Sequence, residues 1–306
     1  MKILTIAVLA ATALTSQAFA QTQPTPPVGP DFSKIEVKTF DLGRNTYMLE
    51  GAGGNVTVAV GDDAIIMVDG QFAPMHDKLK AAIEAQSKLP IRYLINTHYH
   101  GDHTGGNEGF SKIGVTVVAH PFVGKILGEG FTNGLTGAKT PPRPAEALPK
   151  LTYDGGAMAL EIKGRVAQLK HPAAAHTGGD TWVFFADANV LSTGDTVTIG
   201  RYPNIDFANG GNIKGMIEAS DAYLAATNDG SKIVPGHGPL ATRAQLAEYR
   251  AMLATARDRM AKLIEDGKTE QEVLALKPFA DLDAKWAPTE QASTNFMRVV
   301  YNSLKK

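Results

Sequence analysis

The chain has 306 residues, with 30 Lys and Arg against 31 Asp and Glu, a formal net charge of −1 and no cysteine. Because the charge is balanced and no Lys or Arg cluster occurs, nucleic acid and anionic membrane are excluded as expected partners, which leaves a small-molecule substrate. The lack of cysteine excludes disulfide bonds and thiolate metal sites, so a protein of this size must depend on its hydrophobic core.

The first twenty residues have the pattern of a secretory signal peptide. Lys2 precedes the apolar run 3–14, and Ala18-Phe19-Ala20 is a typical cleavage site before Gln21. The run is too short to span a bilayer. We therefore expect residues 1–20 to be removed on export to the periplasm, with an uncleaved N-terminal anchor as the alternative.

The remaining chain divides into a lead-in and one domain. Four prolines between residues 21 and 30 indicate an extended segment, so residues 21–35 are interpreted as a spacer. No linker or charge run divides residues 36–306, which are expected to form a single α/β domain that includes C-terminal helices over 241–306.

Short apolar runs bounded by turn residues alternate with amphipathic stretches, as is typical of β-α-β units. The expected strands cover residues 37–42, 46–49, 56–60, 64–68, 91–96, 115–119, 151–153, 157–162, 166–169, 181–185, 190–192 and 232–234. The expected helices cover residues 74–87, 104–111, 121–127, 213–226, 241–265, 270–276 and 290–304. Residues 128–149 are rich in Gly and Pro, and we interpret them as a flap near a functional site.

The segment Thr97-His98-Tyr99-His100-Gly101-Asp102-His103 places three imidazoles and a carboxylate directly after an expected strand. Side chains at i and i+2 of an extended loop point the same way, so His98 and His100 can bind one ion. Asp102 and His103 can then face a second ion where the chain turns into a helix at Thr104. Imidazole and carboxylate are natural ligands of a borderline divalent metal such as zinc.

Further ligand candidates follow or precede later strands. His176 lies before the expected strand 181–185, Asp195 follows strand 190–192, and His237 follows strand 232–234. Side chains at the carboxyl ends of strands line the functional crevice of α/β proteins, so these three are expected to join the histidine loop. Glycine beside the candidates allows the backbone to come close to a shared centre.

Four motifs in order, His-x-His-x-Asp-His, Ala-His-Thr-Gly-Gly-Asp, Thr-Gly-Asp-Thr and Pro-Gly-His-Gly, resemble the metallo-β-lactamase superfamily of metallohydrolases. With Asp69, the resemblance spans residues 69–239. It implies an α/β (α+β) fold, a four-layer αββα sandwich with extra C-terminal helices, in which the metals lie at one edge between two sheets.

The resemblance also implies a ligand set for two Zn²⁺ ions, with iron as the alternative metal. His98, His100 and His176 would hold the first ion. Asp102, His103 and His237 would hold the second, and Asp195 would bridge the two. Asp102 would also orient the nucleophile and carry its proton. Asp69 would support the ligands from behind, although an ordinary turn aspartate explains it equally well.

Residues outside the ligand set have weaker interpretations. Arg201 and Tyr202 follow Asp195 closely and could contact substrate, or they could belong to a plain loop with a packed tyrosine. His76, His120 and His171 lie outside the motifs and are interpreted as structural or solvated histidines.

The predicted activity is that of an exported dinuclear zinc hydrolase, in which metal-bound hydroxide opens a small amide or ester, most of all a β-lactam. One β-lactamase pattern, however, has cysteine where Asp195 stands and lysine where Thr198 stands. A bridging aspartate is more similar to glyoxalase-II thioesterases and lactonases, although no glutathione-binding motif is recognised. Another class, an iron-dependent sulfur dioxygenase or redox protein on the same fold, stays open.

Overall fold

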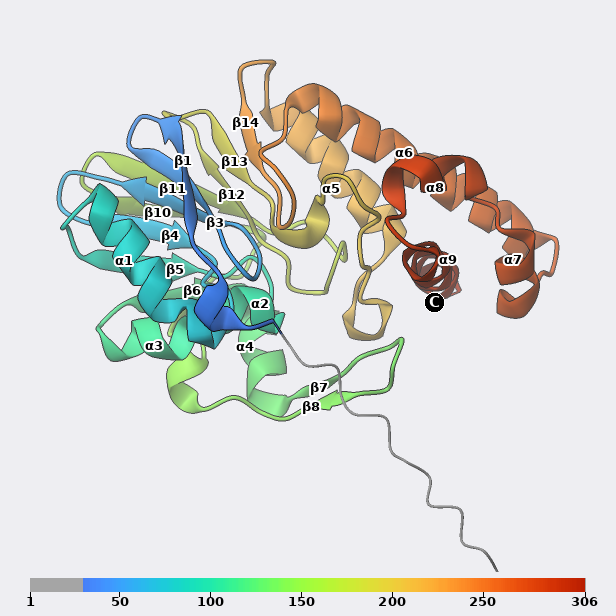
Figure 1. Cartoon of the computed structure of the whole chain (residues 1–306), viewed down its shortest axis with the longest axis horizontal. Helices are drawn as coiled ribbons and strands as arrows, with labels where there is room; N and C mark the ends of the chain where they lie inside the picture. Colours follow the sequence, from blue (N-terminus) through green and yellow to red (C-terminus); the bar gives the residue numbers. More distant parts are fainter. Residues whose placement is uncertain (1–29, 306) are drawn as a thin grey trace, which may run out of the picture. The chain divides into compact units, whose positions relative to one another are not determined.

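Two mixed β-sheets form the centre of the protein, in a computed structural model that describes residues 30–305 (Figure 1). The first sheet has the order β1 (Lys38–Gly43), β2 (Thr46–Glu50), β3 (Val56–Val60), β4 (Ile65–Val68), β5 (Ile91–Ile95), β6 (Thr116–Ala119) and β9 (Leu151–Thr152). The second has the order β10 (Ala157–Ile162), β11 (Arg165–Lys170), β12 (Trp182–Phe185), β13 (Val190–Ser192) and β14 (Lys232–Val234). The expected signal peptide lies outside the described residues.

Each sheet combines antiparallel and parallel pairs. β1 to β4 are antiparallel neighbours, whereas β5, β6 and β9 continue the sheet in parallel with β4. In the second sheet, β14 pairs in parallel with β13 and the other pairs are antiparallel. The parallel strands β4, β5 and β6, together with β13 and β14, therefore bring the chain segments that follow them to corresponding sheet ends.

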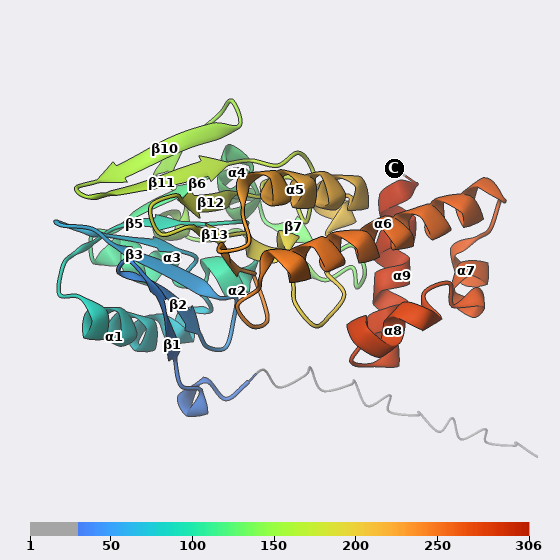
Figure 2. The same ribbon diagram turned by 90° about the horizontal axis from the view of Figure 1, so that it is seen from above.

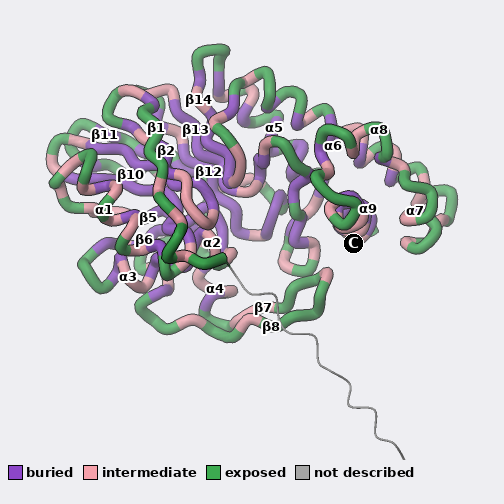
Figure 3. The backbone as a smooth tube through the Cα atoms, in the orientation of Figure 1, coloured by how far each residue is buried: buried purple, intermediate pink, exposed green. Residues whose placement is uncertain are grey.

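The burial of the strands follows their place in the sandwich. β3 and β4 are buried at every position and are apolar except for Thr57, whereas β11 alternates between buried and exposed residues. Side chains of both sheets meet in one core that includes Ile66, Ile95, Leu169 and Val183. Figure 3 shows this buried layer along the strands, with exposed residues concentrated in the turns and outer helices.

Helices cover the outer faces of both sheets. On the first sheet, α1 (His76–Gln86) and α3 (Asn107–Lys112) contribute Leu79, Ile83 and Phe110 to a core with β4 and β5. On the second, α5 (Ile213–Ala226) and α6 (Arg243–Glu265) pack their apolar faces on β12 and β13, as Figure 2 shows from above. The predicted αββα sandwich is therefore confirmed.

The C-terminal helices extend the second helical layer. α7 (Glu270–Leu276), α8 (Ala280–Trp286) and α9 (Glu290–Leu304) follow α6 and lie beyond the sheets in Figure 2. Capping boxes at Thr242 with Gln245 and at Thr269 with Glu272 explain where α6 and α7 begin. The sequence analysis did not expect α8. No helix among the described residues has the length and hydropathy needed to cross a membrane.

Two local expectations need correction. The expected helix 104–111 is instead two short helices, α2 (Gly101–Thr104) directly after His100 and α3 (Asn107–Lys112). The Thr104 hydroxyl donates to the carbonyl of His100, which holds this early turn. The segment 128–149 is also less irregular than expected, because β7 (Phe131–Thr132) and β8 (Lys139–Thr140) form a small hairpin.

Tyr202 fastens the loop after β13 to the C-terminal helices. Its ring stacks on Phe296 with the centroids 4.1 Å apart, and its hydroxyl donates to Asp283 at 2.9 Å. Its backbone N–H donates to the carbonyl of Trp286. The residue is 7% exposed, whereas Arg201 is exposed. These contacts fit the packed-tyrosine alternative for Tyr202 rather than a substrate contact.

The substitution Tyr202→Phe tests this packing role. It keeps the stacked ring and removes the hydrogen bond to Asp283, so the free energy of unfolding should fall by about 1 kcal/mol in urea denaturation. Tyr202→Ala also removes the ring and should lower it by about 3–5 kcal/mol. A Phe variant of unchanged stability but raised KM for its substrate would instead assign Tyr202 to substrate binding.

Candidate metal centre

Seven histidine and aspartate side chains converge at one edge of the sandwich, from loops next to β5, β12, β13 and β14. They form two neighbouring groups. Within each group, the candidate ligand atoms lie within 4.8 Å of one another. The first group contains His98, His100, His176 and Asp195, and the second contains Asp102, His103 and His237. All seven residues expected from the sequence are therefore brought together.

Asp195 lies between the two groups and presents one carboxylate oxygen to each. Its Oδ1 is 3.1 Å from His103 Nε2 and 3.4 Å from His237 Nε2. Its Oδ2 is 4.0 Å from His98 Nε2 and 3.8 Å from His176 Nε2. This arrangement suits a carboxylate that bridges two ions.

Several donor atoms at the centre have no hydrogen-bond partner in the described part of the chain, although a metal ion could bind them. His98 Nε2, His103 Nε2 and Asp195 Oδ1 are buried and have no hydrogen-bond partner among the described residues. Buried polar atoms are normally paired, so unpaired atoms that face a common point indicate a site for an ion. Nitrogen and carboxylate oxygen donors suit zinc and similar divalent ions.

Asp69 lies behind ligands of both groups, where the resemblance implied it would support them. Its Oδ2 is 2.8 Å from His103 Nδ1 and accepts a hydrogen bond from the Thr97 hydroxyl at 2.7 Å. The oxygen of the same Thr97 hydroxyl lies 3.0 Å from His98 Nδ1 and can accept a hydrogen bond from an Nδ1–H group. His98 and His103 are thus fixed in tautomers that leave Nε2 free for a metal.

The sequence analysis missed two supports of the first group, both in the loop before α5. Asp206 Oδ2 is 3.2 Å from His100 Nε2, and the carbonyl of Asn204 is 2.8 Å from His176 Nδ1. Neither residue lies at the end of a strand or in a recognised motif. Only the path of the loop brings them behind the ligands.

Two glycines allow the backbone to approach the ligands closely. A Cβ atom at Gly236 would lie 2.0 Å from Asp195 Oδ1, and one at Gly54 would lie 2.1 Å from the His103 ring. Asn55 binds the turn that holds His237, because its side-chain amide donates to the carbonyls of Pro235 and Gly238. Any larger residue at Gly54 or Gly236 would displace a ligand.

Burial keeps two histidines of the first group, His98 and His176, neutral. Burial lowers the pKa of His98 well below its ordinary value, and the neighbouring His103 and His176 lower it further. Burial likewise lowers the pKa of His176. Both imidazoles therefore offer free lone pairs at neutral pH.

In the second group, the pKa values of the histidines are raised rather than lowered. Burial opposes a charge on His237, but Asp195 and the hydrogen bond with Asp102 raise its pKa to about 9. The pKa of His103 is raised well above its ordinary value, since Asp195 and Asp102 outweigh burial. Burial raises the pKa of Asp102, yet His103 and His237 lower it to about 2. A metal must therefore displace protons here.

The centre is open on one side. The side chains of His100, Asp102 and His237 are 18%, 23% and 20% exposed. The ring of Phe131 in β7 lies 6.4 Å from that of His100 and 4.7 Å from that of Tyr99. The β7–β8 hairpin thus borders the centre, at the position expected for the flap.

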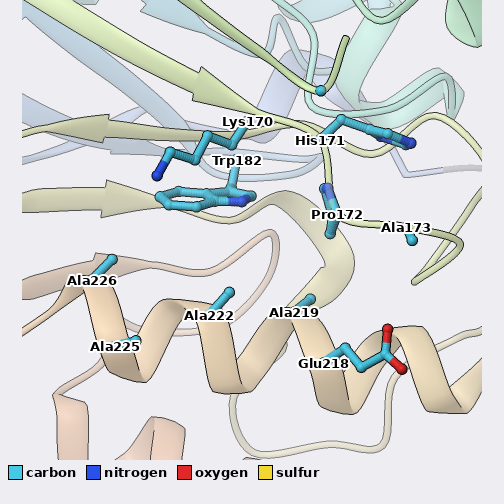
Figure 4. Close-up of a pocket in the computed structure, with 11 residues that line it drawn as sticks. Lys170, His171, Pro172, Ala173, Trp182, Glu218, Ala219, Ala222, Ala225 and Ala226 are labelled. Atoms are coloured by element: carbon cyan, nitrogen blue, oxygen red, sulfur yellow. The ribbon is translucent and has the colours of Figure 1, made fainter.

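A cavity of about 490 Å³ lies elsewhere, between α5 and the β11–β12 pair (Figure 4). Trp182 and alanines of α5 line it, and the Lys170 ammonium lies 5.1 Å from the centroid of the Trp182 ring. None of the seven ligands contributes to its walls. The candidate site is therefore the open metal centre rather than this cavity.

Comparison with known proteins agrees with the geometry. The profile of the Metallo-beta-lactamase superfamily matches residues 49–237, a range that includes all seven ligands. Hydroxyacylglutathione hydrolase of Anaeromyxobacter dehalogenans (strain 2CP-C) is 28% identical over 250 residues, which are 78% of this chain and 82% of that enzyme.

Other similarities are more partial. The alpha subunit of 2,4-dinitroanisole O-demethylase of Nocardioides sp. (strain JS1661) is 26% identical over 152 residues, 49% of this chain and 43% of the subunit. The chain thus spans less than half the length of that relative. Among solved structures, a metallo-beta-lactamase from Pontibacter korlensis has a TM-score of 0.59 at 17% identity. The superposition covers 72% of this chain and 99% of that protein.

The opposite electrostatics of the two groups predict different pH dependences of zinc binding. His237 and His103 are protonated at pH 7, so zinc must release their protons, and affinity should fall by up to about a hundredfold per pH unit below their pKa values. His98 and His176 are already neutral, so the first group should keep zinc as the pH falls.

Calorimetric titration at pH 7 in two buffers of different ionisation enthalpy measures the protons released. We expect one zinc to bind with little proton release and a second with about two protons. Equal proton release at both steps would contradict the assigned charge states.

Proposed function

Since the chain belongs to the metallo-β-lactamase superfamily, we propose that it is an exported dinuclear zinc hydrolase that opens a small amide or ester, most of all a β-lactam. The observation that carries this proposal is Asp195, whose two oxygens face two complete ligand groups. The partial exposure of His100, Asp102 and His237 gives a substrate access to both.

Bound zinc would supply Lewis acidity and lower the pKa of a water molecule toward neutrality. The protein's own contribution is to hold the ligands rigidly through Asp69, Thr97 and Asp206. Asp102 stands at the open side, with Oδ2 3.0 Å from His237 Nε2. Because its pKa is lowered to about 2, it is ionised at neutral pH and can orient the attacking water by accepting a hydrogen bond from it.

Support for a β-lactam substrate comes from the fold, which is similar to a solved metallo-beta-lactamase along nearly that whole chain. A thioesterase or lactonase is the second candidate. An aspartate stands between the two ligand groups rather than a cysteine, and a hydroxyacylglutathione hydrolase is a relative that the chain matches over 78% of its length. Both candidates use the same attack of water on a carbonyl carbon.

Export is proposed from the signal-peptide pattern of residues 1–20. Expression in a Gram-negative host with a C-terminal tag tests it: the protein should be found in the periplasmic fraction with Gln21 as its first residue. Full-length protein in the membrane fraction would favour the anchor alternative.

Hydrolysis of a chromogenic cephalosporin and a carbapenem by the zinc-loaded mature protein tests the activity. Turnover should disappear with chelator and return with zinc. His98→Ala and His237→Ala should each lower kcat/KM at least about a hundredfold, because each removes a ligand of a different ion. His76→Gln is the matched control, since His76 lies outside both groups, and should retain activity.

The other outcomes distinguish the alternatives. Turnover of lactones or S-lactoylglutathione without turnover of β-lactams would overturn the β-lactam assignment in favour of the second candidate. Iron at stoichiometric amounts with a visible charge-transfer band would overturn the zinc hydrolase in favour of a sulfur dioxygenase or redox protein.

A further inference from the structure

Asp206 is the centre of a buried hydrogen-bond network behind the first ligand group. Its Oδ2 faces His100 Nε2 at 3.2 Å and accepts a hydrogen bond from the Tyr99 hydroxyl. The side-chain amide of Asn209 donates to both carboxylate oxygens, at 2.9 and 3.0 Å. The residue is 7% exposed, so these partners replace water around the carboxylate.

The network determines which nitrogen of His100 faces the metal. An ionised carboxylate only accepts hydrogen bonds, so His100 Nε2 must carry the proton that Asp206 receives. Nδ1 is then the free lone pair, and it lies 3.0 Å from His176 Nε2, inside the first group. Asp206 thus sets the tautomer and the ring orientation of a ligand.

The same loop also fixes His176. The backbone N–H of Asp206 donates to the carbonyl of His176 at 2.9 Å, and the carbonyl of Asn204 faces His176 Nδ1 at 2.8 Å. One short segment, residues 204–209, therefore positions two of the three histidines in the first group. We call it the support segment.

The β7–β8 hairpin rests on this support segment. Asn209 Nδ2, which binds Asp206, also donates to the carbonyl of Thr132 at 3.1 Å. At the tip of the hairpin, a Cβ atom at Gly134 would lie 2.8 Å from Ala208 Cβ, so the backbones approach closely there. Phe131 packs its ring against Tyr99, whose hydroxyl binds Asp206. The hairpin is thus connected to His100 through Asn209, Tyr99 and Asp206.

We propose that Asp206 is the positioning residue of the first ligand group and that Asn209 couples metal binding there to docking of the β7–β8 hairpin. When a metal is bound, the Nε2–H of His100 would be a stronger donor, so its bond to Asp206 would tighten and order the carboxylate that Asn209 holds. By linkage, hairpin docking must raise metal affinity by the same factor. The inference rests on the metal centre of the proposed function, but not on its substrate.

Metal affinity tests the positioning role. In competition with a chromophoric chelator, Asp206→Ala should weaken zinc binding at the first group by about 10- to 100-fold, and the visible spectrum of the Co²⁺-loaded protein should change. Asp206→Asn and Tyr99→Phe keep the shape of the network and should give smaller losses. Asp221→Asn, a carboxylate paired with Arg250 on the surface, is the control and should bind zinc like the wild type.

Limited trypsin digestion tests the coupling. Lys139 is the single basic residue of the hairpin, so cleavage after it reports whether the hairpin is docked. Zinc should slow this cleavage about fivefold or more in the wild type. In Asn209→Ala the rate should no longer depend on zinc. Thr132→Ala is the matched control, because only its backbone carbonyl binds Asn209, and it should keep the zinc effect.

The outcomes separate this inference from the proposed function. Wild-type protein that binds two zincs, with unchanged affinity in all Asp206 variants that fold in urea denaturation, would overturn the positioning role. A zinc effect that survives in Asn209→Ala would overturn the coupling. A wild type that binds neither Zn²⁺ nor Co²⁺ would overturn the metal centre and this inference together, whereas failure on β-lactams alone would affect neither.

Discussion

The structure depends on one buried carboxylate, Asp195, which must face two groups of histidines at once. Its position is set by the turn after β13, while the ligands opposite it come from loops after β5 and β14 and before β12. The edges of the two sheets must therefore be held to fractions of an ångström. Hydrogen bonds between the two sheets hold these edges in place. Thr181 donates its N–H to the carbonyl of Thr97, and the Asn55 side chain donates to the turn that contains His237.

Without a metal, the burial of these polar atoms lowers the free energy of unfolding. Imidazole nitrogens and a carboxylate oxygen without hydrogen bonds destabilise a folded protein, and an ion that satisfies them returns that free energy. The asymmetry between the groups follows from their neighbours. Asp102 and Asp195 favour positive charge on His103 and His237, whereas His98 and His176 are desolvated among other histidines. The two ion sites are thus chemically different although they share Asp195.

The C-terminal helices are connected to the metal centre through the loop after β13. Tyr202 ties the loop after β13 to α8 and α9, and the support segment begins only two residues later. The support segment then holds His100 and His176 and carries the β7–β8 hairpin. A continuous chain of packed and hydrogen-bonded residues therefore connects the helical extension, the ligands and the border of the open side.

The strand pattern predicted the α/β class, and the resemblance of four short motifs to the metallo-β-lactamase superfamily predicted the sandwich and the seven candidate ligands. Both signals are local in the chain, since each candidate lies in a short motif beside a strand. The start of the next helix was misplaced, since the backbone N–H groups of His103 and Thr104 already bond the His100 carbonyl, and no residue pattern marks this short turn. The contacts of Asp206, Asn209 and Tyr202 became visible only in the folded chain. These cited partners lie 77 to 107 residues away in the sequence, and a loop carries no periodicity that predicts which distant side chain it will meet.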